Sequence, residues 1–325
     1  MKSLHIWHYT TVNTSGVGGV EKHIAGTSHE LKKMGHTLHV GTNFPDSFAS
    51  NHENQKFILH THGDCWPTFE FLRSIKTQHQ NVKWIHICHG NTFERMRACK
   101  EYLSLSDWKG FARDGSLLYL CDRIIAVSKH AAAETQKYYG LSKKISVIHN
   151  GADTETFKPL HKITTNPFLL FLGRAHDHVK NIDGIMKATS QLYQRHDDVQ
   201  LWIAPGFETT HPFVKNLGKL DAGALAETMQ ICRALVLCSF YEGDPLVVRE
   251  AMAMGLPIVA SDIPGTREAL ADYENKIFVD PNNLGTIETG IERALYEKDF
   301  KPIAHARSWK VVATELNAYY LTLFQ

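Results

Sequence analysis

The chain has 325 residues, of which 43% are hydrophobic and 21% are charged. This length favours two domains of roughly 150 residues each, and the composition excludes a disordered or fibrous protein. The longest apolar runs are much shorter than the ~20 residues that a transmembrane helix needs, and the amino-terminal stretch lacks the apolar region of a signal peptide. We therefore expect a cytoplasmic globular protein.

Charge is unevenly divided between the two halves of the chain. Residues 1–161 contain 19 Lys and Arg against 14 Asp and Glu, a net of +5, and the remainder contains 16 against 20, a net of −4. A mildly basic first half suits a phosphate or a membrane surface, but this excess is too small to indicate nucleic acid. The six cysteines form no Cys-x-x-Cys pair, which indicates reduced and mostly buried thiols.

Short runs rich in Ile and Val alternate with helix-length segments in the first half, which predicts a parallel sheet with crossover helices. The predicted strands are 4–10, 36–43, 56–63, 82–90, 123–129 and 145–151. The first helix is marked by Val20, Ile24, Thr27, Leu31 and Met34 at helical spacing. Two prolines in 157–167 and weak periodicity place a linker near residue 160.

The second half repeats this alternation, so a second parallel sheet is expected there. Its predicted strands are 168–173, 199–204, 213–218, 234–240, 257–262 and 276–280. If the second predicted strand is extended to Gly206, only residues 207–212 lie between it and the third predicted strand. A parallel crossover needs about a dozen residues. Either a helix is missing here or this strand is misassigned. Ligands of such sheets bind beyond the carboxyl ends of the strands.

Three segments that follow predicted strands carry candidate site residues. Gly16, Gly18 and Gly19 open the first helix, where backbone amides can approach a phosphate, although a simple turn also explains glycines there. Arg174 and Lys180 follow a strand and suit a diphosphate; a solvated basic turn is the alternative.

In "YEGDPLVVREAMAMG" (241–255), Glu242 follows a buried strand, and Glu250 lies in an apolar helix that begins near Pro245. A buried carboxylate there needs a hydroxyl or a cation as partner. A ribose diol is one candidate for Glu250, and a salt bridge to Arg249 or another buried basic residue is the alternative.

The chain resembles the family-4 retaining glycosyltransferases of the GT-B fold (group 1 glycosyltransferases), which transfer a sugar from a nucleoside diphosphate to an acceptor. The resemblance rests on "GVGG", "HICHGN", "AVSKHAAAE", "IHNGAD", "FLGR", a following "KN" and "EGDPLVVREAMAMGLPIVASDIPG", in this order along nearly the whole chain. It implies two Rossmann-like domains around a cleft: residues 1–161 for the acceptor, 162–305 for the nucleotide sugar, and a helix over 306–325 that returns to the first domain.

The resemblance also implies roles for individual residues. The amides of Gly18 and Gly19, with Arg174 and Lys180, would hold the diphosphate, and Glu250 would bind the ribose. The donor sugar would contact Glu242, Gly243, Asp244, Pro245 and Leu246, and His89 would border its reacting carbon. The base would meet Leu217 to Leu220, and Asn150 and Asp153 would form a hinge.

Two departures from the family pattern concern this site. Arg174 and Lys180 are one residue further apart than is common in the family, and Asp244 replaces an apolar or aromatic residue.

Other features leave alternatives open. His5, His8, His60, His62, His86 and His89 lie on or beside predicted strands of the first half; a metal site is one interpretation, but we expect no metal and no cofactor besides the donor. The basic and aromatic segment 93–113 suits either a membrane carrying a lipid-linked acceptor or a helix face packed on the sheet.

The predicted function is transfer of a hexose-type sugar from a UDP- or GDP-linked donor to a glycan or lipid-linked acceptor in polysaccharide or lipopolysaccharide biosynthesis. The alternatives are a sugar-nucleotide epimerase of the same fold and a catalytically silent sugar-nucleotide-binding subunit. A nicotinamide oxidoreductase is disfavoured because no acidic residue ends the second predicted strand, "HVGTNFP".

Overall fold

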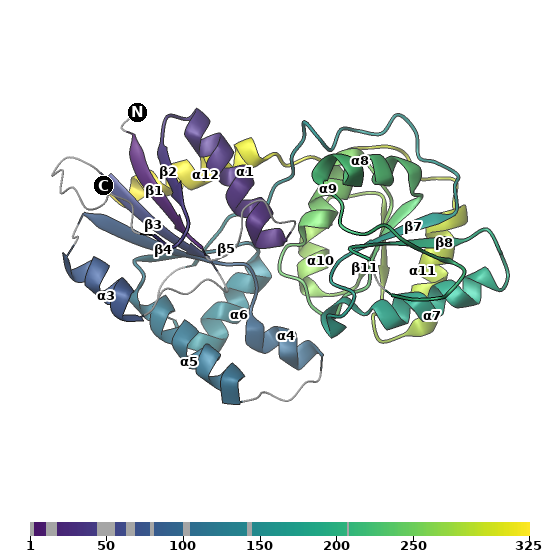
Figure 1. Cartoon of the computed structure of the whole chain (residues 1–325), viewed down its shortest axis with the longest axis horizontal. Helices are drawn as coiled ribbons and strands as arrows, with labels where there is room; N and C mark the ends of the chain where they lie inside the picture. The colour runs from purple at the N-terminus through teal and green to yellow at the C-terminus, as the bar shows by residue number, and fades with distance from the viewer. Residues whose placement is uncertain are drawn as a thin grey trace. The chain divides into compact units, whose positions relative to one another are not determined.

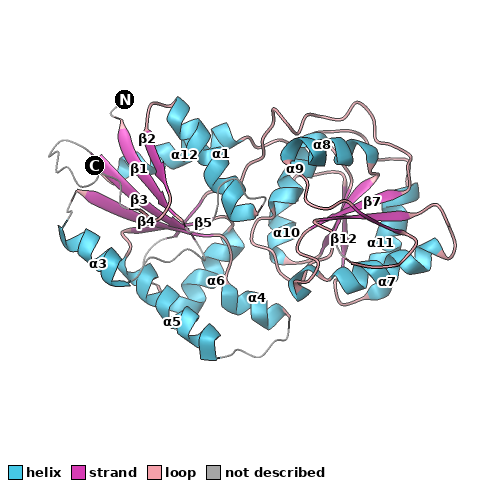
Figure 2. Cartoon of the chain, in the orientation of Figure 1, coloured by secondary structure: helices cyan, strands magenta, loops and turns pink. Residues whose placement is uncertain are grey.

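The computed structural model describes residues 3–10, 18–43, 56–62, 69–78, 81–99, 105–141, 145–206 and 208–325. The chain divides into two compact units, each built on a six-stranded parallel sheet (Figures 1 and 2). The first unit comprises residues 1–93, 102–150 and 308–325, and the second comprises residues 94–101 and 151–307. The prediction of two tandem parallel sheets is confirmed.

The first sheet has the strand order β2-β1-β3-β4-β5-β6. Its strands are β1 (Leu4–Tyr9), β2 (Thr37–Val40), β3 (Lys56–His62), β4 (Val82–Cys88), β5 (Arg123–Ala126) and β6 (Ile145–Val147). The helices along this part of the chain are α1 (Gly19–Lys33), α3 (Phe69–Gln78), α4 (Thr92–Ala98), α5 (Leu105–Leu120), α6 (Lys129–Tyr139) and, from the carboxyl end, α12 (Trp309–Thr322). Residues 94–98 of α4 group with the second unit.

Helices cover both faces of the first sheet (Figure 1). Side chains alternate along β1, so Ile6 packs in a core with Leu31 of α1 and Leu316 of α12, whereas Trp7 packs in a core with Leu117 of α5. By the same alternation, His8 lies on the face of α1 and α12. Gly26 of α1 is required by close packing, because a β-carbon there would lie 2.5 Å from the Trp309 ring.

The second sheet has the strand order β12-β11-β10-β7-β8-β9. Its strands are β7 (Phe168–Leu172), β8 (Gln200–Ala204), β9 (Val214–Asn216), β10 (Ala234–Leu237), β11 (Ile258–Ser261) and β12 (Lys276–Val279). The helices are the 3-10 turn η1 (His178–Lys180), α7 (Ile182–Tyr193), α8 (Ala222–Ile231), α9 (Leu246–Met254), α10 (Pro264–Ala269) and α11 (Leu284–Tyr296). Residues of α8, α9 and α10 pack in one core, and residues of α7 and α11 pack in the other.

Two predictions concern the second unit. β9 pairs in parallel with β8, and no helix separates them among residues 205–206 and 208–213. The strand prediction is therefore confirmed, with a short connection in place of a helical crossover. The linker was predicted near residue 160; there, Phe157 is 2% exposed in a core of the second unit, and the Leu160 amide donates to the Met254 carbonyl, so this segment packs on the second unit.

Among the described residues, no helix is both long enough and apolar enough to span a membrane. Cys88, Cys121, Cys232 and Cys238 are buried and Cys99 is half-buried, and all five are free thiols. Cys65 lies outside the described residues.

Candidate active site

The second sheet changes direction between β7 and β10, and this point organises the candidate site. The chain runs from β7 to β8 and β9 on one side, and then returns to place β10 on the other side of β7. Ligands of open parallel sheets bind outside the carboxyl ends of the strands at such a switch point. Arg174 follows β7 and Glu242 follows β10, so the fold brings these two sequence-predicted segments to one place.

A buried ion pair joins the two segments. Lys180 Nζ lies 2.7 Å from Glu242 Oε1, and the side chains are 20% and 9% exposed. The Phe240 amide also donates to the Val179 carbonyl over 2.8 Å, which fixes the backbones next to this pair. Lys180 has three N–H donors and one is used here, so the same ammonium group can also donate to a ligand oxygen.

Arg174 is held by an acid that the sequence interpretation did not assign. Its Nη2 lies 2.9 Å from Asp177 Oδ2, and Arg95 Nη2 lies 2.7 Å from Asp177 Oδ1. Burial by itself raises the pKa of Asp177. The hydrogen bond and charge of Arg95, together with smaller contributions from the Val179 amide and Arg174, lower it by more, so the pKa lies below its usual value. The extra residue between Arg174 and Lys180 thus belongs to a turn organised by an ionised carboxylate.

The Arg174 side chain itself remains open to solvent. It is 67% exposed in spite of its ion pair with Asp177. That contact uses one of the five N–H donors of the guanidinium group. The turn therefore presents a cation at the carboxyl end of β7, where an anionic ligand can reach it.

The helix that carries Glu250 is buried along its whole length. All nine residues of α9 are buried, and Glu250 is 4% exposed. Arg249 was one of the alternative partners for Glu250, but its guanidinium group binds the buried Asp244 over 2.9 Å. Asp244 therefore neutralises the buried Arg249. This role explains why position 244 carries an acid, where the family pattern has an apolar or aromatic residue.

The backbone after β10 is tightly packed against the next helix. Gly265 lies in the first turn of α10, and a β-carbon there would lie 2.0 Å from the Glu242 carbonyl oxygen. Any other residue at 265 would push Glu242 and Gly243 away. Gly265 is thus a positioning residue. The sequence interpretation quoted it within "ASDIPG" but assigned it no role. Pro245 caps α9, and Leu246 is its first residue.

The predicted base-contact segment lies at the other side of the switch point. Leu217 follows β9, and its amide donates to the Ile203 carbonyl over 2.9 Å. Gly218 has φ +68°, a conformation that favours glycine. The segment is therefore an ordered turn at the carboxyl end of the sheet, as a backbone contact to a base requires.

The remaining candidates belong to the first unit. Gly18 caps α1 and Gly19 begins it, whereas Gly16 lies outside the described residues. His89 follows β4 and is half-buried, and its Nε2 lies 3.2 Å from His62 Nδ1. Asn150 is buried, and its side-chain oxygen accepts from His23 Nδ1 of α1.

Asp153 holds its own turn in the second unit. Its carboxylate accepts hydrogen bonds from the amides of Glu155 and Thr156 and from the Thr156 hydroxyl. These bonds give Asp153 a structural role.

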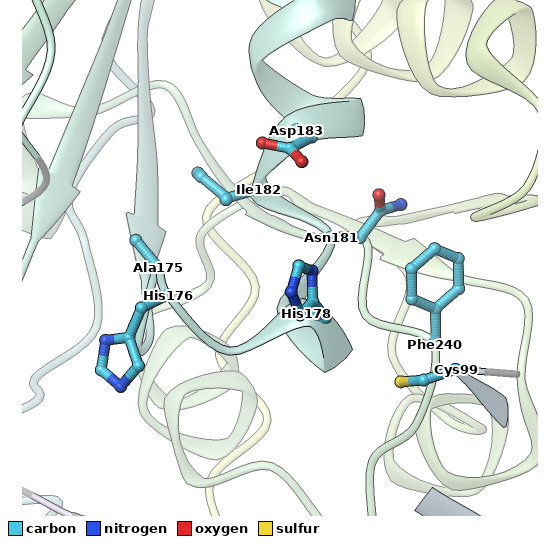
Figure 3. A pocket seen from close by; sticks show the side chains of 8 residues that line it. All are labelled: Cys99, Ala175, His176, His178, Asn181, Ile182, Asp183 and Phe240. Carbon is cyan, nitrogen blue, oxygen red and sulfur yellow. The ribbon is translucent and has the colours of Figure 1, made fainter. Parts of the chain in front are cut away.

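A pocket of about 530 Å³ lies beside the turn that holds Arg174 and Lys180. It is lined by Cys99, Ala175, His176, His178, Asn181, Ile182, Asp183 and Phe240 (Figure 3). Neither Glu242 nor Glu250 lines it. The pocket therefore adjoins the paired cations without being the predicted donor site.

Family models match both parts of the chain. Glycosyl transferases group 1 matches residues 152–309, and Glycosyltransferase Family 4 matches residues 52–156. The O-antigen chain mannosyltransferase B of Escherichia coli is 27% identical over 184 residues, which cover 50% of this chain and 48% of that protein. The matched part thus spans about half the length of this relative.

Solved structures show the same fold over the whole chain. Sucrose-phosphate synthase from Thermosynechococcus elongatus has a TM-score of 0.80 at 17% identity, with 99% of each chain covered. Anabaena HepE in complex with UDP and glucose has a TM-score of 0.70 at 15% identity, covering 99% of this chain and 98% of that one. The fold is GT-B, and the chain belongs to the group 1 glycosyltransferases of family 4.

Proposed function

We propose that this glycosyltransferase moves a hexose-type sugar, with retention of configuration, from a UDP- or GDP-linked donor to a glycan or lipid-linked acceptor of polysaccharide biosynthesis. The observation that carries the proposal is the charged arrangement at the switch point of the second sheet. Lys180, Glu242 and Arg174 gather there, with the buried Glu250 on the adjoining α9.

The proposed chemistry needs positive charge at the leaving group. Breaking the bond between sugar and phosphate builds negative charge on the departing diphosphate, and fixed donors aimed at that charge lower the barrier. Arg174 and Lys180 are suited to this role because each is already positioned by a carboxylate. Gly18 and Gly19 are proposed to add backbone amides, and no metal is assigned to the donor.

The carboxylates are proposed to recognise neutral hydroxyls. Glu242, with the backbone of Gly243 to Leu246, would bind the donor sugar, and Glu250 would bind the ribose. In the retaining mechanism proposed here, the acceptor attacks the face that the leaving group occupies, and a phosphate oxygen takes the acceptor proton. Glu242 then holds the sugar without being a nucleophile, and His89 borders the reacting carbon.

Contact with a membrane is proposed only for part of segment 93–113. Arg95 and Arg97 are engaged by Asp177 and Glu94, which makes them poor candidates for lipid phosphates. Trp108 is 50% exposed, and Lys109 next to it is also exposed. A peripheral contact would therefore centre on α5, and cosedimentation of Trp108→Ala with anionic vesicles tests it.

Thermal shift measurements with UDP, GDP, ADP and NAD, and with the matching sugar nucleotides, test the donor site. A ligand at a hundred times its dissociation constant stabilises the protein by about 2.7 kcal/mol. We expect stabilisation by one nucleoside diphosphate that disappears in Glu250→Ala. Stabilisation by NAD alone, or by none of these ligands, would contradict the proposal.

An acceptor assay separates the alternative functions. Product formed from a sugar nucleotide and an acceptor supports transfer. Conversion of the sugar nucleotide without acceptor indicates an epimerase, and binding without turnover indicates a silent subunit.

A further inference from the structure

Five imidazoles meet at the carboxyl end of the first sheet, on the face that α1 and α12 cover. They are His8 of β1, His60 and His62 of β3, His23 of α1 and His89 after β4, and we call them the histidine cluster. In this sheet the chain reverses direction between β1 and β3, so the cluster also lies at a switch point, where ligands bind.

Buried ring nitrogens in this cluster have no hydrogen-bond partner among the described residues. They are Nε2 of His8, His23 and His60. A buried polar atom without a partner costs about 1–3 kcal/mol, and several at one place call for an ion or ordered water. An ordinary packed core would carry apolar side chains here. The histidine cluster therefore lowers the stability of the fold unless it binds an ion or ordered water.

The hydrogen bonds of His23 determine its tautomer. Its Nδ1 lies 2.9 Å from Asn150 Oδ1, and an amide oxygen only accepts, so the proton is on Nδ1. The lone pair is therefore on the buried Nε2. Histidine ligands of metal ions nearly always donate their other N–H to a carbonyl or carboxylate in this manner, so His23 is oriented as a ligand.

His62 and His89 complete a set of three nitrogens with His23. One nitrogen from each lies within 4.8 Å of the others. His62 Nδ1 and His89 Nε2 are 3.2 Å apart, close to the roughly 3.3 Å between two nitrogens of a tetrahedral ion at Zn–N distances of 2.0–2.1 Å. His62 can donate its Nε2–H to His8 Nδ1, 2.9 Å away, and this tautomer leaves the lone pair of His62 on its Nδ1.

Burial also favours this set. A second triad, formed by His8, His60 and His62, is fully buried, whereas His89 is half-buried. The triad with His89 is therefore the more accessible of the two to an ion.

We propose that His23, His62 and His89 of the first unit bind one borderline transition-metal ion, for which Zn²⁺ is the natural probe. Three imidazoles suit Zn²⁺ rather than Mg²⁺, which prefers oxygen ligands. Such a set leaves the fourth tetrahedral position for water or another ligand.

The test begins with wild-type protein freed of metal by a chelator and then titrated with Co²⁺. Tetrahedral Co²⁺ gives intense visible absorption bands, and we expect these to saturate at one equivalent and to be abolished by Zn²⁺ but not by Mg²⁺. Weak octahedral bands alone, or Zn²⁺ uptake that does not saturate near one equivalent, would overturn the proposal. This measurement does not depend on any variant folding correctly.

Matched variants then locate the ion. His23→Asn and His29→Asn remove a buried and an exposed histidine from the same helix, α1. We expect His23→Asn to lose at least about tenfold in Zn²⁺ affinity, as the loss of a supporting group alone costs about 10–100-fold, and His29→Asn to bind as wild type. Asn150→Ala removes the hydrogen bond that supports His23 but keeps the imidazole, and it should weaken binding about tenfold.

Circular dichroism of each metal-free variant confirms that its fold is retained. Equal affinity in wild type, His23→Asn and Asn150→Ala would overturn the proposal. So would loss of the site in His60→Asn with full binding in His23→Asn, because the ion would then occupy the other triad.

Discussion

The two units build similar sheets but bury opposite kinds of polar group at their switch points. The first buries neutral imidazoles that contact one another, whereas the second buries charges of opposite sign in pairs, as in Lys180–Glu242 and Asp244–Arg249. A buried charge survives only with a partner, and a buried histidine survives by losing its proton. The second unit therefore presents cations that suit an anionic ligand, and the first presents nitrogen lone pairs that suit a metal ion.

The largest effect on stability is expected from breaking one buried pair of the second unit. Asp244→Ala leaves Arg249 buried without its carboxylate, which should lower the free energy of unfolding by about 3–5 kcal/mol. The exposed pair of Asp262 and Arg267 provides the control, since Asp262→Ala should cost at most about 1 kcal/mol. Urea denaturation measures both.

A double variant separates the charge effect from the loss of packing. Asp244→Ala combined with Arg249→Met removes both charges, and we expect it to recover most of the stability lost in Asp244→Ala. If the double variant is as unstable as the single one, the pair is not what makes Asp244 important.

A slightly smaller effect, on catalysis, is expected from the exposed cation of the same unit. Arg174→Ala should lower kcat about a hundredfold, or about 3 kcal/mol, because one donor to the developing diphosphate charge is lost. Asp177 keeps its contact with Arg95 in this variant, so the turn should persist. Arg195→Ala removes another paired surface arginine and should turn over normally; similar losses in both variants would contradict the assignment.

The sequence predicted most of the fold because alternating apolar runs specify parallel strands directly. It also located Arg174, Lys180 and Glu242, since a residue just after a strand must lie at the carboxyl edge of the sheet. It did not predict the ion pairs between distant segments, such as Arg95 with Asp177, 82 residues apart. Such pairs depend on tertiary packing that periodicity does not encode.

The segment near residue 160 and the histidine cluster show two limits of what the sequence could predict. The prolines near residue 160 marked an irregular segment, but irregular chain can still be packed, as the buried Phe157 demonstrates. The histidines were noted individually as strand residues. Their convergence required the parallel register that sets His8 beside His60 and the helix that adds His23.

The last and smallest effect concerns the pH dependence of the first unit in the presence of a chelator. Burial lowers the pKa of His86 to about 3, against about 6.5 in the unfolded chain. The unfolded state alone binds this proton between those values, so the stabilisation is complete above pH 6.5 and is lost as the pH falls toward 3.

At pH 5 the expected loss from this one histidine is about 2 kcal/mol. His86→Gln should therefore flatten the fall in stability of the first unit by about 1.4 kcal/mol per pH unit, whereas His29→Gln, on an exposed face of α1, should leave it unchanged. Pulsed hydrogen exchange during urea denaturation measures the unfolding of β4 and of β10 separately. Between about pH 6.5 and 5 the loss of stability should be confined to the first unit, because its buried histidines gain protons on unfolding in this range, whereas carboxylates ordinarily titrate near pH 4. An equal loss at β10 over this range would show that the two units do not differ in this way.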